Sequence, residues 1–132
     1  MFDDAKPIFL QVADRIADDI LRGTYVEGAQ VPSTNELAAY LRINPATAGK
    51  GLNLLVTQQI LTKRRGIGMF VAEGARARVA AERQRGFVNE FIDPLAAEAR
   101  ALGLSRVEVI RLLDIALAEP ENDEALSRDH PG

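Results

Sequence analysis

Residues 33–56, with the sequence STNELAAYLRINPATAGKGLNLLV, contain two helix starts in close succession. Ser33-Thr34-Asn35-Glu36 matches a capping box, in which the Ser33 hydroxyl and the Glu36 carboxylate each accept from the other residue's backbone N–H. Asn44-Pro45 matches an N-cap followed by the first residue of a helix, where proline removes no hydrogen bond. Two helices joined by three or four residues predict a helix-turn-helix.

Two glycines, Gly49 and Gly51, lie inside the second of these helices, which we expect to run from about Pro45 to Gln58. Each should cost roughly 1 kcal/mol relative to alanine. Gly51 falls on the apolar face, where its missing side chain would let the preceding helix cross closely. Gly49 falls toward the outside, where it would remove bulk from a surface that binds a partner.

The flanking segments complete a winged helix. Residues 8–21 carry apolar side chains at helical spacing, and Gly23 follows them, which predicts an amphipathic helix with a glycine stop. Residues 60–62 and 69–71 are β-prone and enclose Gly66-Ile67-Gly68, which predicts a hairpin with its tip at the glycines. The expected fold class is mainly α with a small β-hairpin, and the winged helix-turn-helix covers residues 7–73.

Residues 74–118 predict a short, two-helix C-terminal part. Asp93-Pro94 interrupts the first helix, so we expect a kink there or a new start with Asp93 as the cap. Gly103 ends this helix, and Ser105 and Glu108 form a second capping box that opens the next one. Residues 119–132 are polar and predict a mostly disordered tail.

The apolar stripes of these two helices are too large for the helices to bury between themselves. We therefore expect them to form the interface of a homodimer. The predicted interface residues are Phe87, Phe91, Ile92, Leu95, Leu102, Val109, Leu112 and Leu113.

Composition excludes several classes of function. The 132 residues suffice for one domain and a small appendage, and they include no cysteine and a single histidine, His130, in the polar end. We find no catalytic constellation, phosphate loop or metal motif, so we expect no enzyme activity, no cofactor and no metal. The N-terminus is acidic and no apolar run approaches the length that spans a bilayer, which favours a cytoplasmic protein without a membrane partner.

The charge is distributed unevenly along the chain, although its net value is only −3. Residues 37–72 contain five basic side chains and no Asp or Glu, whereas from Glu73 onward eight Arg face twelve Asp and Glu. This asymmetry favours a polyanionic partner for the middle of the chain. A helix fits the DNA major groove and its first turn points at base edges, so the second helix of the motif should read DNA. A winged helix that contacts only protein is the alternative.

On that helix the outward positions include Ala46, Thr47 and Lys50, with Asn44 at the start. We expect Asn44, Thr47 and Lys50 to read the bases, and the Ala46 methyl to be available to thymine. The hairpin adds the basic triplet Lys63-Arg64-Arg65.

The segment from Pro7 to Ala72 resembles the N-terminal domain of the GntR family of bacterial transcription regulators. Its markers are Pro7, VPS at 31–33, ELA at 36–38 and GMFV at 68–71. NPAT at 44–47, KRRGIGMFV at 63–71 and the short C-terminal part resemble the YtrA subfamily. The resemblance implies a homodimeric transcription regulator, most often a repressor, bound to a palindromic double-stranded DNA operator.

In the family, the start of the second helix, the third helix and the wing contact the operator. For this chain the resemblance adds Ser33, Thr34, Asn35, Gly66 and Gly68 to the residues named above. Asn35, Pro45 and Gly49 stand where the family commonly has arginine, so Lys50 and the basic triplet should carry more of the binding. The C-terminal part is too small for the larger effector pockets of the family, although an unidentified small-molecule effector could bind between helices or subunits.

Overall fold

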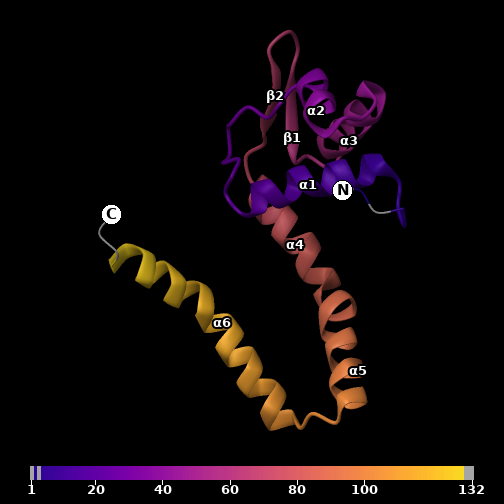
Figure 1. Ribbon diagram of the computed structural model, residues 1–132. Coiled ribbons are helices and arrows are strands. Elements are labelled where there is room, and N and C mark those ends of the chain that lie inside the picture. The colour runs from indigo at the N-terminus through magenta and orange to yellow at the C-terminus, as the bar shows by residue number, and fades with distance from the viewer. Residues whose placement is uncertain (1, 3, 130–132) are drawn as a thin grey trace. The chain divides into compact units, whose positions relative to one another are not determined.

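The structure is a computed structural model that describes residues 2 and 4–129, with side chains described as far as residue 118. The chain divides into two compact units, Met1–Arg85 and Gly86–Gly132. The described residues form six α-helices, one π-helical turn and two strands. Figure 1 shows the arrangement of the labelled helices and strands. None of the helices in this part of the chain is sufficiently long and apolar to pass through a bilayer.

Three helices open the N-terminal unit: α1 (Ile8–Leu21), α2 (Thr34–Leu41) and α3 (Pro45–Thr57). The predicted capping box is present, with Ser33 Oγ accepting from Glu36 N at 3.1 Å and Glu36 Oε1 accepting from Ser33 N at 3.0 Å. Asn44 caps α3 as predicted, because its Oδ1 accepts from Ala46 N at 2.8 Å. The helix-turn-helix therefore begins both of its helices where the sequence predicts.

The wing is a two-stranded antiparallel hairpin of β1 (Leu61–Arg64) and β2 (Gly68–Val71). Its register pairs Leu61 with Val71 and Arg64 with Gly68. Gly68 therefore lies in β2, and residues 65–67 form the tip. In Figure 1, α2, α3 and this hairpin lie on the same side of α1.

The two glycines of α3 are explained by different neighbours from those that the sequence suggested. A Cβ at Gly51 would lie 2.9 Å from both Phe9 O and Val12 Cγ1, so α1, and not α2, makes the close approach there. A Cβ at Gly49 would lie 3.4 Å from Thr34 Cγ2 at the start of α2. Gly51 is buried on the packed face as expected, but the wrong helix was predicted to approach it. Gly49 is half-buried at the junction with α2, and not on the outer surface as expected.

The core of this unit continues past residue 73 into α4 (Ala75–Phe87). Ala75 and Val79 are buried with the side chains of α1, α2, α3 and the hairpin. Arg83 also donates to Asp18 Oδ1 of α1 at 2.8 Å. The first part of α4 therefore belongs to the winged unit, which extends to Arg85 and beyond the boundary suggested by the sequence.

In the C-terminal unit, the π-helical turn η1 (Val88–Ile92) leads into α5 (Asp93–Leu102). Asp93 has helical angles, φ −62° and ψ −46°, and its N–H donates to Val88 O, five residues earlier. The prediction of Asp93 as a cap is therefore wrong. The π turn accommodates Pro94 near the start of α5 without ending the helix. Gly103, with φ 71°, ends α5 as predicted.

The last helix, α6 (Arg106–Asp129), opens with the predicted second capping box. Ser105 Oγ accepts from Glu108 N at 3.1 Å. The backbone stays helical through residues 119–129, where the sequence suggested a disordered tail. Glu, Ala, Leu and Arg in this stretch favour a helix, whereas Pro120, Asn122 and Asp123 disfavour one, so helix propensity alone does not account for the difference. The rest of the predicted tail, residues 130–132, lies outside the described residues.

Candidate nucleic-acid interface

Three segments with predicted DNA contacts meet in the N-terminal unit: the start of α2, the start of α3 and the wing. Gly49 of α3 lies beside Thr34 of α2, as described above. The wing is connected to the same region by Gln30, whose Nε2 donates to Ile67 O at the wing tip at 3.1 Å. Gln30 lies three residues before Ser33 in the sequence, so the segment that leads into α2 also contacts the wing tip.

At the start of α2, Ser33 and Asn35 are exposed, whereas Thr34 is half-buried beside Gly49. Ser33 Oγ accepts a hydrogen bond in the capping box, and its hydroxyl proton can still be donated to a phosphate oxygen. The Ser33 backbone N–H, followed by its side chain, holds the pKa of the Glu36 carboxyl below its ordinary value. Thr34 therefore packs the helix junction, while Ser33 and Asn35 remain accessible to a ligand.

At the start of α3, Asn44, Ala46 and Lys50 are exposed and Thr47 is half-buried. The Oδ1 of Asn44 is used as the helix cap, but its amide NH₂ has no partner among the described residues. That group can donate to a phosphate or to a base acceptor. Lys50 Nζ lies 4.1 Å from the centroid of the Phe9 ring on α1, a contact that the sequence did not reveal.

The basic triplet of the wing divides between the two faces of the hairpin, because successive residues of a strand point to opposite sides. Lys63 pairs with Met69, on the face that carries the buried side chains. Arg64 lies on the other face, with its guanidinium carbon 4.5 Å from the centroid of the Phe70 ring. Arg65 is exposed at the tip. The triplet is therefore not one patch, although all three side chains are exposed.

Gln30 supports the wing and was not among the predicted site residues. Its Nε2 would lie 2.4 Å from a Cβ at Gly68, whose φ is 144°, so the glycine makes room for the glutamine. Gly66 has φ 77° and open space around it, so it is needed at the tip for its backbone conformation alone. Gln30 lies 37 residues from Ile67 in sequence, and no local pattern could reveal that contact.

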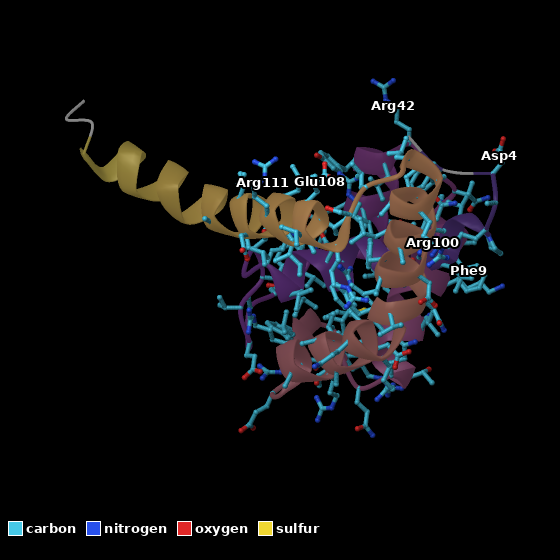
Figure 2. The ribbon with its side chains drawn as sticks, turned by 90° about the horizontal axis from the view of Figure 1, so that it is seen from below. Asp4, Phe9, Arg42, Arg100, Glu108 and Arg111 are labelled. Carbon is cyan, nitrogen blue, oxygen red and sulfur yellow. The ribbon has the colours of Figure 1, made fainter. Side chains whose placement is uncertain are left out.

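The electrostatic character of this region follows from which basic residues are paired. Lys6, Arg22, Arg83 and Arg85 each form an ion pair with a carboxylate. Among the described residues, the five basic side chains of residues 37–72 form none: Arg42, Lys50, Lys63, Arg64 and Arg65. Figure 2 shows the side chain of Arg42, in the turn of the helix-turn-helix, extending away from the ribbon. These five charges are available to a polyanion.

A groove of about 510 Å³ lies between α1, the following loop and α2. Its lining includes Arg15, Asp19, Tyr25 and Tyr40. Burial, together with the nearby charge of Asp19, raises the pKa of the Tyr25 hydroxyl. Within the described part of the chain, no three His, Cys, Asp or Glu side chains gather in a way that could hold a metal ion.

The predicted dimer residues are accessible in the structure. Phe87, Phe91, Ile92, Leu95, Leu102, Leu112 and Leu113 are exposed, and Val109 is half-buried. The rings of Phe87 and Phe91 lie with their centroids 5.7 Å apart. These apolar side chains are thus accessible to a partner, and their place in a dimer interface stays a prediction.

Comparison with known proteins identifies similar transcription regulators. A model of the gntR family of bacterial regulatory proteins matches residues 9–71. The HTH-type transcriptional regulator YhcF of Bacillus subtilis is 30% identical over 109 residues, which cover 83% of this chain and 88% of YhcF. The HTH-type transcriptional repressor YtrA of the same organism is 28% identical over 100 residues, which cover 76% of each protein.

Solved structures agree with the sequence relatives. A protein from Bacteroides thetaiotaomicron, assigned to the GntR family of transcriptional regulators, has a TM-score of 0.66 and 33% identity, covering 86% of this chain and 99% of that one. The DNA-binding domain of AraR in complex with operator ORX1 has a TM-score of 0.52 and 28% identity, covering 55% of this chain and 93% of that one. These relatives are transcription regulators, not enzymes. The winged helix of residues 9–71 is thus the DNA-binding domain of a transcription regulator, and the chain belongs to the GntR family.

Proposed function

We propose that this GntR-family regulator is a homodimeric repressor that binds a palindromic operator. The observation that carries the proposal is the set of unpaired basic side chains on the winged unit, between residues 37 and 72. Each neutralised phosphate releases counterions, so these charges supply affinity for DNA of any sequence. YtrA is named a repressor, and AraR is solved with its operator, which supports the same role here.

Within each half-site, we assign different roles to the exposed residues. Asn44 and Lys50, at the start of α3, would read base edges in the major groove, with the Ala46 methyl against thymine. Arg64, Arg65 and the start of α2 would contact phosphates and fix the register. The apolar residues of η1, α5 and α6 would bring two copies together.

Fluorescence anisotropy with the promoter region upstream of the protein's own gene tests this proposal. We expect binding to that DNA at concentrations well below those needed for a random duplex of equal length. Arg65→Ala should weaken binding to both duplexes, because it removes an unpaired charge at the wing tip. Arg22→Ala is the matched control, since it removes an arginine that is paired with Asp18 on α1.

The alternative is a winged helix that contacts protein only. Under that alternative, neither duplex binds at physiological salt, and Arg65→Ala and Arg22→Ala behave alike. DNA binding without any preference for a palindromic site would instead contradict the operator assignment alone.

A further inference from the structure

Lys50 and Phe9 come from helices that the chain separates by a loop and by α2, yet their side chains meet. The Lys50 ammonium lies 4.1 Å from the centroid of the Phe9 ring, a distance typical of a cation–π contact. The adjacent residue, Gly51, packs its backbone against Phe9 O, where a Cβ would be only 2.9 Å away. The ring is therefore held next to the lysine by the close approach of α1 to α3.

We propose that Phe9 is a positioning residue for Lys50 and sets its specificity as a base reader. This inference rests on the proposed function, in which Lys50 is the long side chain on the outward face of α3. A lysine ammonium is a point charge on a flexible four-carbon stem, and ordering it on binding opposes affinity. A ring that restricts the ammonium before DNA arrives lowers that cost and favours one hydrogen-bonding geometry.

The wing contains a second cation–π contact, between Arg64 and Phe70, which should affect DNA binding differently. Arg64 is held over Phe70, within the same hairpin, at a position that we assign to phosphate contact. A phosphate contact is made on every DNA sequence, whereas a base contact is made only on the preferred one. Loss of the ring beneath Lys50 should therefore alter the discrimination between operator and random DNA. Loss of the ring beneath Arg64 should alter the affinity for all DNA. Phe70→Leu is thus the matched control for Phe9→Leu.

The first measurement needs no DNA. In the NMR spectrum of the full chain, the ring current of Phe9 should shift the Lys50 ε-methylene protons upfield. The shift should disappear in Phe9→Leu and persist in Phe9→Tyr, which keeps the ring. Circular dichroism and thermal unfolding of each variant check that it remains folded.

The second measurement is a double-mutant cycle on operator and random DNA. Phe9→Leu should weaken operator binding about two- to fivefold, as expected for a cation–π contact at an exposed site, and leave random DNA unchanged. Phe9→Tyr should restore operator affinity. In a Lys50→Met background, Phe9→Leu should have no further effect. Phe70→Leu should lower binding to both duplexes by a similar factor.

Several results would overturn the inference. An equal loss from Phe9→Leu with and without Lys50 would show that Phe9 acts only through the fold. Tighter operator binding by Phe9→Leu would show that the ring withholds Lys50 from DNA. A parent chain that binds no DNA would overturn the proposed function and this role together. Normal operator binding, without the NMR shift or the coupling, would overturn the positioning role alone.

Discussion

Gly51 of α3 lies against Val12 of α1 so closely that a Cβ at position 51 would be 2.9 Å from Val12 Cγ1. The Phe9 carbonyl oxygen lies at the same distance from that Cβ position, so neither helix can make room without moving its backbone. The contact fixes α3, the recognition helix expected to read DNA, against α1. Gly51 is therefore a packing requirement, and its low helix propensity is offset by the close approach that it permits.

Gly51→Ala should lower the free energy of unfolding by about 1–3 kcal/mol, as overpacking of a core does, even though alanine favours the helix. Gly49→Ala is the control, because its Cβ would meet Thr34 Cγ2 at 3.4 Å, close to ordinary contact. We expect the control to leave stability nearly unchanged or raise it slightly. Urea unfolding of the two variants tests this, and equal stabilities would contradict the packing assignment.

A second prediction concerns Gln59, which follows the end of α3 with φ 62°. This left-handed conformation favours glycine, and Gln59 N donates to Val56 O while Ile60 N donates to Leu55 O. Gln59→Gly should raise the free energy of unfolding by about 1 kcal/mol, because it removes the strain of a side chain at positive φ. Gln58→Gly, at φ −80°, should instead lower it. Thermal unfolding of both variants measures the difference, and a stabilising Gln58→Gly would argue against this account.

Local signals explain why so much of the fold could be predicted from the sequence. The caps at Ser33, Asn44 and Ser105 each depend on residues two or three positions away, and all three are present in the structure. Helix starts and the hairpin tip were predictable for the same reason. The order of these elements, three helices followed by a hairpin, predicted a winged helix, which the relatives confirm.

Long-range contacts account for what the sequence did not predict. The partners of Gly51, Lys50 and Ile67 lie on segments far away in the chain, and periodicity only says which face of a helix is apolar. The extent of the winged unit was missed similarly, because α4 is mostly polar and only Ala75 and Val79 enter the core. At Asp93-Pro94, the sequence correctly predicted an interruption, but it was wrong about the cap, because a π turn leads directly into α5 and leaves Asp93 with helical angles.

The ion pairs of Asp18 make the stability of the winged unit depend on pH. Arg22 and Arg83 donate to its carboxylate at 2.9 and 2.8 Å, and the hydrogen bond from Arg22 is the main cause that lowers the Asp18 pKa below its ordinary 3.8. A carboxyl whose pKa is lower in the folded state than in the unfolded state stabilises the fold when the pH is above its unfolded-state pKa. This stabilisation is lost as the pH falls through the folded-state pKa.

Asp18→Asn should therefore be less stable than the parent chain at neutral pH. The difference should begin to shrink as the pH falls below about 4, the ordinary pKa of an unfolded Asp, and should continue to shrink as the folded carboxylate is protonated at lower pH. Asp4→Asn, at an exposed carboxylate that forms no ion pair among the described residues, is the control. Thermal unfolding between pH 7 and pH 3 measures both differences, and a constant gap for Asp18→Asn would contradict the linkage.

Salt dependence tests whether the unpaired basic residues meet phosphates. If each subunit makes three or four such contacts, a dimer should show a slope of roughly −5 to −7 in log affinity against log salt concentration. Arg65→Ala removes one contact from each subunit and should reduce the magnitude of the slope by about 2. Arg22→Ala should leave the slope unchanged, because Arg22 is paired with Asp18. Binding that is insensitive to salt would mean that these charges do not lie on the DNA.

The last prediction concerns the exposed apolar residues of the C-terminal unit, which we propose are buried in the interface of a dimer. A two-fold axis through these helices would place two recognition helices about 34 Å apart, or a multiple of that, to match successive turns of the operator. Binding of the second half-site then becomes intramolecular, so a dimer should bind the whole operator about 10²–10⁴ times more tightly than a monomer does. Because Ala75 and Val79 belong to the winged core, the truncation must end at Arg85 and not at Glu73.

We expect residues 1–85 to be folded and monomeric and to lose this gain in affinity, as measured by sedimentation and anisotropy. In the full chain, Phe91→Asp and Leu113→Asp should each shift the dimer toward monomer, because a carboxylate would be buried without a partner. Ala97→Asp, on α5 but outside the predicted interface, should not. A dimeric 1–85 fragment, or a full chain that is monomeric at micromolar concentration, would rule out this interface. Loss of the dimer with unchanged operator affinity would instead show that the two half-sites are bound independently.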